Sequence, residues 1–147
     1  MYKRILLAYD GSESGQKALL DCQEIAALSQ SVLILIAVMP PTTAYVGFES
    51  GVYQNSPEEL EAQKQKYDAI LADGLRRLAT SGRKAEGEVV VGESVDAITQ
   101  FAKKIDADLI VVGHKHLDGW AARWWRGATS RSLIEYAHCS VLVVITH

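Results

Sequence analysis

Five short apolar runs alternate with four helical patterns along this chain of 147 residues, and no other feature limits its fold as strongly. The runs are Ile5–Tyr9, Val32–Val38, Glu88–Val91, Leu109–Val112 and Val141–Ile145. Several of them are apolar at almost every position, which is typical of strands that are covered on both faces. Strands that alternate with helices predict an α/β fold, with a parallel sheet between two layers of helices. The length predicts one domain over residues 1–147.

The helical patterns carry recognisable start signals or apolar stripes. They cover about Ser12–Ser29, Ser56–Ser81, Val95–Ile105 and Thr129–Ala137. The second pattern has the clearest start, because Ser56-Pro57-Glu58-Glu59 combines a serine N-cap, a proline in the first turn and a glutamate at the capping-box position. We therefore expect a long second helix that begins at this segment.

Composition excludes several classes of function. The formal net charge is −3 and no basic stripe stands out, so we expect no nucleic-acid partner. No apolar run approaches the length needed to cross a bilayer, and the first residues carry no cleavage pattern, so a cytoplasmic protein without a membrane partner is predicted. Cys22 and Cys139 are isolated in the sequence, and we expect both to stay reduced.

Three segments follow strands that we expect to end at one edge of the sheet. In sheets of this kind the ligand crevice lies beyond the carboxyl ends of the strands, which selects Asp10-Gly11-Ser12, Val38–Pro41 and the stretch from Gly113 to Ser130. The carboxylate of Asp10 can accept a hydrogen bond from a ligand, while Ser12 is suited to cap a helix. The stretch from Gly113 contains glycines between a strand and a helix N-terminus, where free N–H groups and the helix dipole can hold phosphate oxygens.

Four stretches of the chain resemble the universal stress protein family. They are Ile5-Leu6-Leu7-Ala8-Tyr9-Asp10-Gly11-Ser12, Ala107-Asp108-Leu109-Ile110-Val111-Val112-Gly113-His114, Gly127-Ala128-Thr129-Ser130-Arg131-Ser132-Leu133 and Cys139-Ser140-Val141-Leu142-Val143-Val144. They occur in the family's order and span nearly the whole chain. The resemblance implies a three-layer α/β sandwich of the adenine-nucleotide α-hydrolase-like type, with five parallel strands in the order 3-2-1-4-5, and commonly a dimer.

Family members that bind ATP carry the pattern Gly-x2-Gly-x9-Gly-Ser/Thr after the fourth strand, and this chain departs from it. Gly113 matches the first glycine, but His116 stands at the second. Ten residues separate His116 from Gly127, and Ala128 replaces the hydroxyl residue. Thr129-Ser130 follows directly and supplies hydroxyl groups if the loop shifts by one residue. The nucleotide-binding pattern is therefore degraded.

The physical effect of this departure has two opposing parts. A histidine Cβ crowds the close approach of backbone to phosphate that glycine permits. Cationic side chains near the loop, such as Lys115 and Arg126, can compensate electrostatically. The resemblance implies that Asp10 and Val38 border the adenosine half of an adenine nucleotide, ATP included, and that the glycine loop borders its phosphates. The candidate binding residues are Asp10, Val38, Gly113, His114, His116, Gly127, Ala128, Thr129 and Ser130.

The predicted function is a cytoplasmic, dimeric, nucleotide-responsive binding or regulatory module. An alternative is a stress protein that binds no nucleotide and acts by dimerisation and protein contact. A slow ATP hydrolase ranks below both, since no catalytic set is evident and an enzyme is not expected. His114 and His116 lack a nearby third ligand, so we predict no metal site.

Three further segments carry predictions about partners and loops. The run Ser140–Ile145 is apolar on both faces; placed at a sheet edge, it predicts a homodimer through pairing with the same strand of a second subunit. The cluster Trp120, Trp124 and Trp125 is suited to core packing or a subunit contact, with a membrane surface or adenine stacking as further alternatives. The long segment Met39–Asn55 is either a flap over the crevice or a surface excursion.

Overall fold

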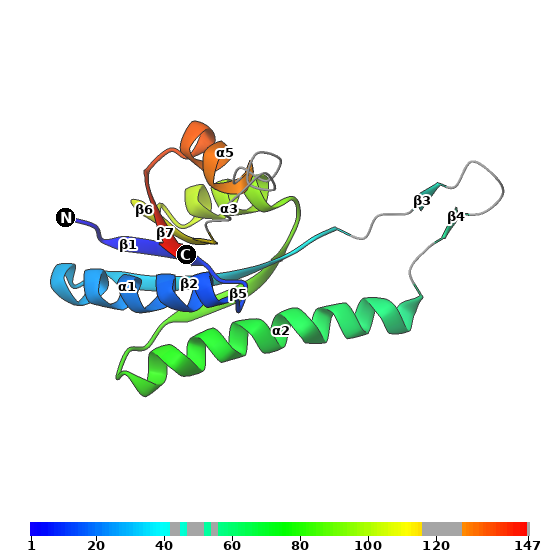
Figure 1. Cartoon of the computed structure of the whole chain (residues 1–147), viewed down its shortest axis with the longest axis horizontal. Helices are drawn as coiled ribbons and strands as arrows, with labels where there is room; N and C mark the ends of the chain where they lie inside the picture. The colour runs from blue at the N-terminus through cyan, green and yellow to red at the C-terminus, as the bar shows by residue number, and fades with distance from the viewer. Residues whose placement is uncertain (42–44, 47–51, 54–55, 116–127, 147) are drawn as a thin grey trace.

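Five parallel strands form the central sheet of the protein (Figure 1). The computed structural model describes residues 1–41, 45–46, 52–53, 56–115 and 128–146. The strands are β1 (Arg4–Ala8), β2 (Val32–Met39), β5 (Glu86–Val91), β6 (Leu109–Lys115) and β7 (Ser140–Thr146). They are arranged in the order β5-β2-β1-β6-β7, and every neighbouring pair is parallel. This is the predicted order 3-2-1-4-5, counted along the five strands of this sheet.

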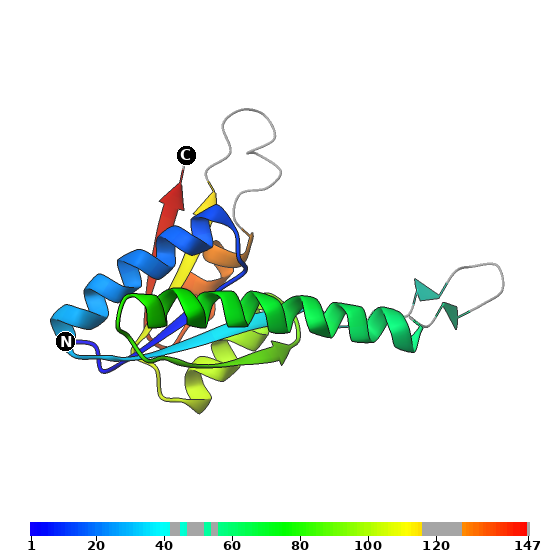
Figure 2. The same ribbon diagram turned by 90° about the horizontal axis from the view of Figure 1, so that it is seen from below.

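Two helices cover each face of the sheet, which confirms the three-layer architecture. The helices are α1 (Glu13–Ser29), α2 (Pro57–Thr80), α3 (Ser94–Lys104) and α5 (Ala128–Tyr136). Helix α1 packs against β6 and β7, and α2 packs against β2 and β5. Figure 2 shows both helices in front of the sheet, while α3 and α5 lie behind it. Each predicted helix is confirmed to within about one residue at its ends.

Two hydrophobic cores explain why the strands are apolar without alternation. Leu7 and Val111 belong to the core under α1 and α2. Leu6 and Ile110, one residue earlier in each strand, belong to the core under α3 and α5. All four side chains are 0% exposed, because successive side chains of a strand point to opposite faces and both faces are covered.

Helix α2 begins with the capping box that the sequence predicted. The N–H of Glu59 donates to Ser56 Oγ at 3.2 Å, and the N–H of Ser56 donates to Glu59 Oε2 at 2.9 Å. The helix is 24 residues long, and its first half extends beyond the sheet (Figure 1). Its second half reaches the core, where Gly74 and Leu78 are buried. Helix α2 is therefore anchored to the sheet by its second half alone.

The structure corrects three predicted boundaries. Strand β5 was expected to begin at Glu88, but it begins at Glu86. Strand β6 was expected to end at Val112, but it continues to Lys115 because β7 pairs with it through Thr146. The segment Met39–Asn55 was expected to be irregular, but Met39 ends β2 and two short antiparallel strands, β3 (Tyr45–Val46) and β4 (Val52–Tyr53), lie within it. Figure 1 shows these two strands beyond the N-terminal end of α2, away from the five-stranded sheet.

Cys22 lies on the buried side of α1 and is 0% exposed. Burial raises the pKa of the Cys22 thiol to about 12, so the group stays protonated at neutral pH. Cys139 is partly buried, and burial raises the pKa of its thiol as well. Across the described residues, no helix has both the length and the apolar character that crossing a membrane requires.

Candidate functional site at the carboxyl edge of the sheet

Strands β2, β1 and β6 end side by side, which brings predicted site residues to one edge. Ala8 pairs in register with Ile36 on one side and with Val112 on the other. The N–H of Tyr9 donates to the carbonyl of Ile36 at 2.8 Å, which continues this alignment past the end of β1. Asp10 and the later residues of β2 and β6, Val38 and Gly113, therefore lie at the same edge of the sheet.

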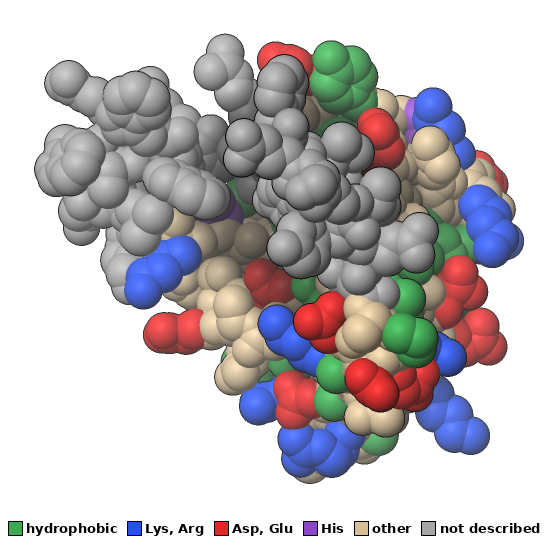
Figure 3. All heavy atoms as spheres, turned by 90° about the vertical axis from the view of Figure 1, so that its right-hand side faces the viewer, with side chains coloured by type: hydrophobic (Ala, Val, Ile, Leu, Met, Phe, Trp, Pro, Cys, Tyr) green, Lys and Arg blue, Asp and Glu red, His purple; other side chains and the backbone are tan. Residues whose placement is uncertain are grey.

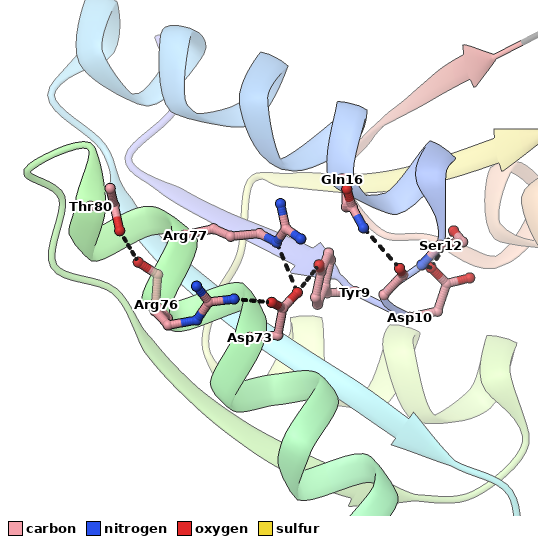
Figure 4. A network of polar contacts seen from close by, with 9 residues as sticks. Tyr9, Asp10, Ser12, Gln16, Asp73, Arg76, Arg77 and Thr80 are labelled. Atoms are coloured by element: carbon pink, nitrogen blue, oxygen red, sulfur yellow. Dashed lines mark hydrogen bonds and ion pairs between the residues drawn. The ribbon is translucent and has the colours of Figure 1, made fainter.

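The carboxylate of Asp10 is held in a tight turn at the end of β1 (Figure 4). Its Oδ1 atom accepts hydrogen bonds from the Ser12 N–H at 3.0 Å and from the Ser12 hydroxyl at 2.5 Å. Ser12 Oγ in turn accepts the N–H of Gly15 at 3.1 Å, which confirms Ser12 as the N-cap of α1. Gly11 permits the turn because its φ of +77° is a conformation that other residues rarely adopt.

Gly15, in the first turn of α1, lies between Asp10 and Gly113. A Cβ at Gly15 would come within 2.6 Å of Asp10 Oδ1. A Cβ at Gly113 would come within 2.6 Å of the Gly15 nitrogen, and closer still to the Ser14 carbonyl. Gly113 is thus required for β6 to approach the N-terminus of α1. This packing role needs no ligand, and the sequence analysis, which assigned Gly113 to phosphate, did not anticipate it.

Val38 and His114 lie on the face of the sheet that α3 and α5 cover. Val38 packs against the core beneath these helices, as does Val112. Side chains alternate along a strand, so His114, two residues after Val112, is on the same face. The imidazole of His114 is half-buried and lies beside Ile145 in the ladder with β7.

Helix α5 begins at this edge with Ala128, one residue earlier than predicted. Strands β6 and β7 are parallel, so the chain leaves β6 at the carboxyl edge and α5 returns along the sheet to the start of β7. Residues 128–130 form its first turn, where backbone N–H groups have no partner within the helix. The remaining predicted residues, His116 and Gly127, lie outside the described residues, as does the tryptophan cluster.

A buried tyrosine joins this edge to α2, and the sequence analysis missed it. The Tyr9 hydroxyl donates to Asp73 Oδ2 at 2.7 Å (Figure 4). Arg77 Nε also donates to Oδ2, at 2.9 Å, and Arg76 donates to Oδ1 at 2.5 Å. The Tyr9 hydrogen bond, followed by that of Arg77, lowers the pKa of Asp73 to about 2. Only the contacts of Asp73 with Arg76 and Arg77 could have been predicted from the sequence, because residues three and four positions apart lie on one face of a helix.

The lowered pKa predicts how stability depends on pH. The Asp73 carboxyl has an ordinary pKa of 3.8 and a folded value of about 2, so its charge stabilises the folded state above pH 3.8. We expect wild type to be more stable than Asp73→Asn at pH 6, with a difference that shrinks as the pH falls below 3.8. Urea unfolding of both proteins between pH 6 and pH 3 measures this. A difference that stays constant or widens on acidification would contradict the assignment.

Among the described residues, the face of the molecule on this side carries mixed charge (Figure 3). Figure 3 views the molecule from the side on which β1 and β2 end, and among the coloured residues Lys and Arg are interspersed with Asp and Glu. Within the part of the chain that the structure describes, no three His, Cys, Asp or Glu side chains are grouped to hold a metal ion.

The fold places the chain among the α/β proteins with an open parallel sheet between two layers of helices. In this class, ligands bind beyond the carboxyl ends of the strands. The family model described as universal stress protein family matches residues 1–144. The universal stress protein Sll1388 of Synechocystis is 30% identical, with 97% of each chain covered. A universal stress protein of Thermus aquaticus is also 30% identical, with 98% of this chain and 99% of the relative covered. The chain belongs to the universal stress protein family.

Solved structures of the family share the fold. A universal stress protein in complex with cAMP is 25% identical, with a TM-score of 0.69 over 99% of this chain and 97% of that one. An Archaeoglobus fulgidus protein in complex with dAMP is 22% identical, with a TM-score of 0.67 over 97% and 98%. An Arabidopsis thaliana protein with AMP bound is 19% identical, with a TM-score of 0.67 over 99% and 92%.

Proposed function

We propose that this protein is a cytoplasmic, dimeric regulatory module that binds an adenine nucleotide at the carboxyl edge of its sheet. The observation that carries the proposal is that β1, β2 and β6 end side by side, which brings Asp10, Val38 and Gly113 to the edge at which α5 begins. Relatives of the same fold are described in complex with cAMP, dAMP or AMP, which supports an adenine nucleotide as the ligand class.

In this proposal the two halves of the nucleotide contact different residues. Asp10 and Val38 border the adenosine, where the second oxygen of the Asp10 carboxylate can accept a hydrogen bond from a hydroxyl or amino group. Gly113, Gly127 and the first turn of α5, residues 128–130, border the phosphates, because free N–H groups and the helix dipole favour an anion there. His114 and His116 add donors beside the phosphates.

Calorimetric titration with AMP, ADP and ATP tests the proposal. We expect saturable binding to wild type, and about tenfold weaker binding to Asp10→Ala, the loss typical of one hydrogen bond to a charged group. The matched control is Asp21→Ala, which removes a partly exposed carboxylate about two turns after the start of α1. Absence of heat with every nucleotide at millimolar concentration would reject nucleotide binding.

A module of the same fold that binds no nucleotide is the alternative. It is favoured by His116 and Ala128, which replace a glycine and a hydroxyl residue of the ATP-binding pattern. On this alternative, the double variant His116→Gly, Ala128→Ser gains nucleotide binding that the parent lacks. Binding already present in the parent would refute it.

The dimer part of the proposal is supported by β7. This strand is at the edge of the sheet, its sequence is apolar, and Ile145 is 48% exposed. An apolar edge strand with unpaired backbone groups is stabilised by pairing with its own copy across a two-fold axis. We expect a dimer in sedimentation velocity at micromolar concentration, and a monomer at every concentration up to 100-fold higher would contradict it.

A further inference from the structure

Helix α2 lies beside both neighbours of Asp10 in the chain. On one side, the hydroxyl of Tyr9 donates to Asp73 of α2 at 2.7 Å. On the other, a Cβ at Gly11 would lie 3.7 Å from the side chain of Ile70, one turn earlier in the same helix. The turn that carries Asp10 therefore rests on one face of α2 through residues 70 and 73.

The Tyr9 side chain has little freedom to move within this contact. It is 2% exposed, and its ring lies against Gly74, where a Cβ would come within 2.8 Å of Tyr9 Cδ1. Its other edge faces Gly15, whose Cβ would be 3.5 Å from Cδ2. The acceptor is fixed as well, because Arg76 and Arg77 hold both oxygens of Asp73. The hydrogen bond thus joins two side chains that are each held in place.

We propose that Tyr9 and Asp73 are positioning residues through which α2 fixes the Asp10–Ser12 turn. The inference rests on the proposed function, in which the Asp10 carboxylate contacts the nucleotide. Asp10 follows Tyr9 directly, and its Oδ1 atom must keep both hydrogen bonds to Ser12 if its other oxygen is to face a ligand. A shift of α2 relative to β1 changes the affinity for nucleotide without any contact between α2 and the ligand.

Hydrogen exchange of the ligand-free protein tests the positioning directly. In Tyr9→Phe, which keeps the ring and removes the hydroxyl, we expect the Ser12 and Gly15 amides to exchange about fivefold faster than in wild type. The Ile110 amide, in the buried strand β6, serves as the internal reference for global unfolding. A general loss of stability would accelerate exchange at Ile110 as well, whereas a positioning role accelerates exchange at the turn alone.

A second variant and a control complete the experiment. Asp73→Asn keeps Tyr9 intact and is expected to accelerate the same two amides; Tyr136→Phe removes a hydroxyl from an exposed tyrosine on α5 and is expected to leave them unchanged. AMP should bind Tyr9→Phe and Asp73→Asn about fivefold more weakly than wild type. If the Ser12 and Gly15 amides exchange at the wild-type rate in both variants, the inference is overturned. Wild type that binds no AMP would refute the proposed function, and the ligand-free exchange rates would still decide the positioning.

Discussion

Replacing Gly113 by alanine is expected to lower the free energy of unfolding by about 3 kcal/mol, near the upper end of the usual cost of overpacking. The added Cβ would lie 2.6 Å from the Gly15 nitrogen and closer to the Ser14 carbonyl. These are backbone atoms of the first turn of α1, so no side chain can rotate away to make room. Strand β6 and helix α1 must separate, and urea unfolding without any nucleotide measures the cost.

Gly82→Ala is the matched control for this substitution. Gly82 has a φ of +79°, but nothing lies within 4 Å of an added Cβ. Its replacement should therefore cost only the backbone strain of a left-handed conformation, about 1 kcal/mol. If Gly113→Ala costs no more than Gly82→Ala, the contact between β6 and α1 is not as tight as the structure shows. In that case, the glycine at 113 would need a different explanation, such as a ligand.

Leu6→Ala and Leu7→Ala are each expected to lower the free energy of unfolding by about 3 kcal/mol, as is usual for a large apolar side chain removed from a core. The two residues are adjacent in β1, and both are 0% exposed. Leu6 packs in the core under α3 and α5, and Leu7 packs in the core under α1 and α2. Two large and similar losses follow because helices cover both faces of the sheet.

Chemical denaturation of the two variants, with Leu28→Ala as the control, measures these losses. Leu28 is on α1 and is 83% exposed, so its truncation should change stability by less than about 0.5 kcal/mol. A sheet with one open face would give one large and one negligible loss between Leu6 and Leu7. That asymmetry would contradict the three-layer arrangement.

The strand order was predictable only in part from the residues themselves. Apolar runs such as Val32–Val38 predicted buried parallel strands, because helices on both faces leave no polar side to the strand. Periodicity, however, does not say which strand lies beside which. The predicted order came from the resemblance to the family. The structure confirms that β1 and β2 are neighbours in the middle of the sheet, where Arg4 pairs with Val32 and Ala8 pairs with Ile36.

The starts of two helices were predicted correctly from short motifs in the sequence. Ser12 was predicted as an N-cap and the Ser56–Glu59 segment as a capping box, since both depend on residues within three or four positions of each other. The predicted end of β6 was three residues too early. Gly113 resembles a loop residue in sequence, and only the long-range ladder with β7 shows that the strand continues.

The contacts that the sequence analysis missed join residues far apart in the chain. Tyr9 and Asp73 are 64 positions apart, and neither stands out among the chain's tyrosines and aspartates. Gly113 and Ser14 meet only after β6 has been placed beside β1 with α1 packed across both. Such contacts are decided by tertiary packing, which single-residue propensities and short motifs do not encode.

Binding of an adenine nucleotide where β1, β2 and β6 end is the proposal on which the function of this protein depends. Backbone amide NMR during titration with AMP locates the bound nucleotide, because each amide reports on its own surroundings. We expect saturating shifts at Gly11, Ser12, Gly113 and His114, with the amides of Asp106 and Asp108 at the opposite edge unchanged. Shifts confined to that opposite edge, or no shifts at millimolar AMP, would contradict this proposal.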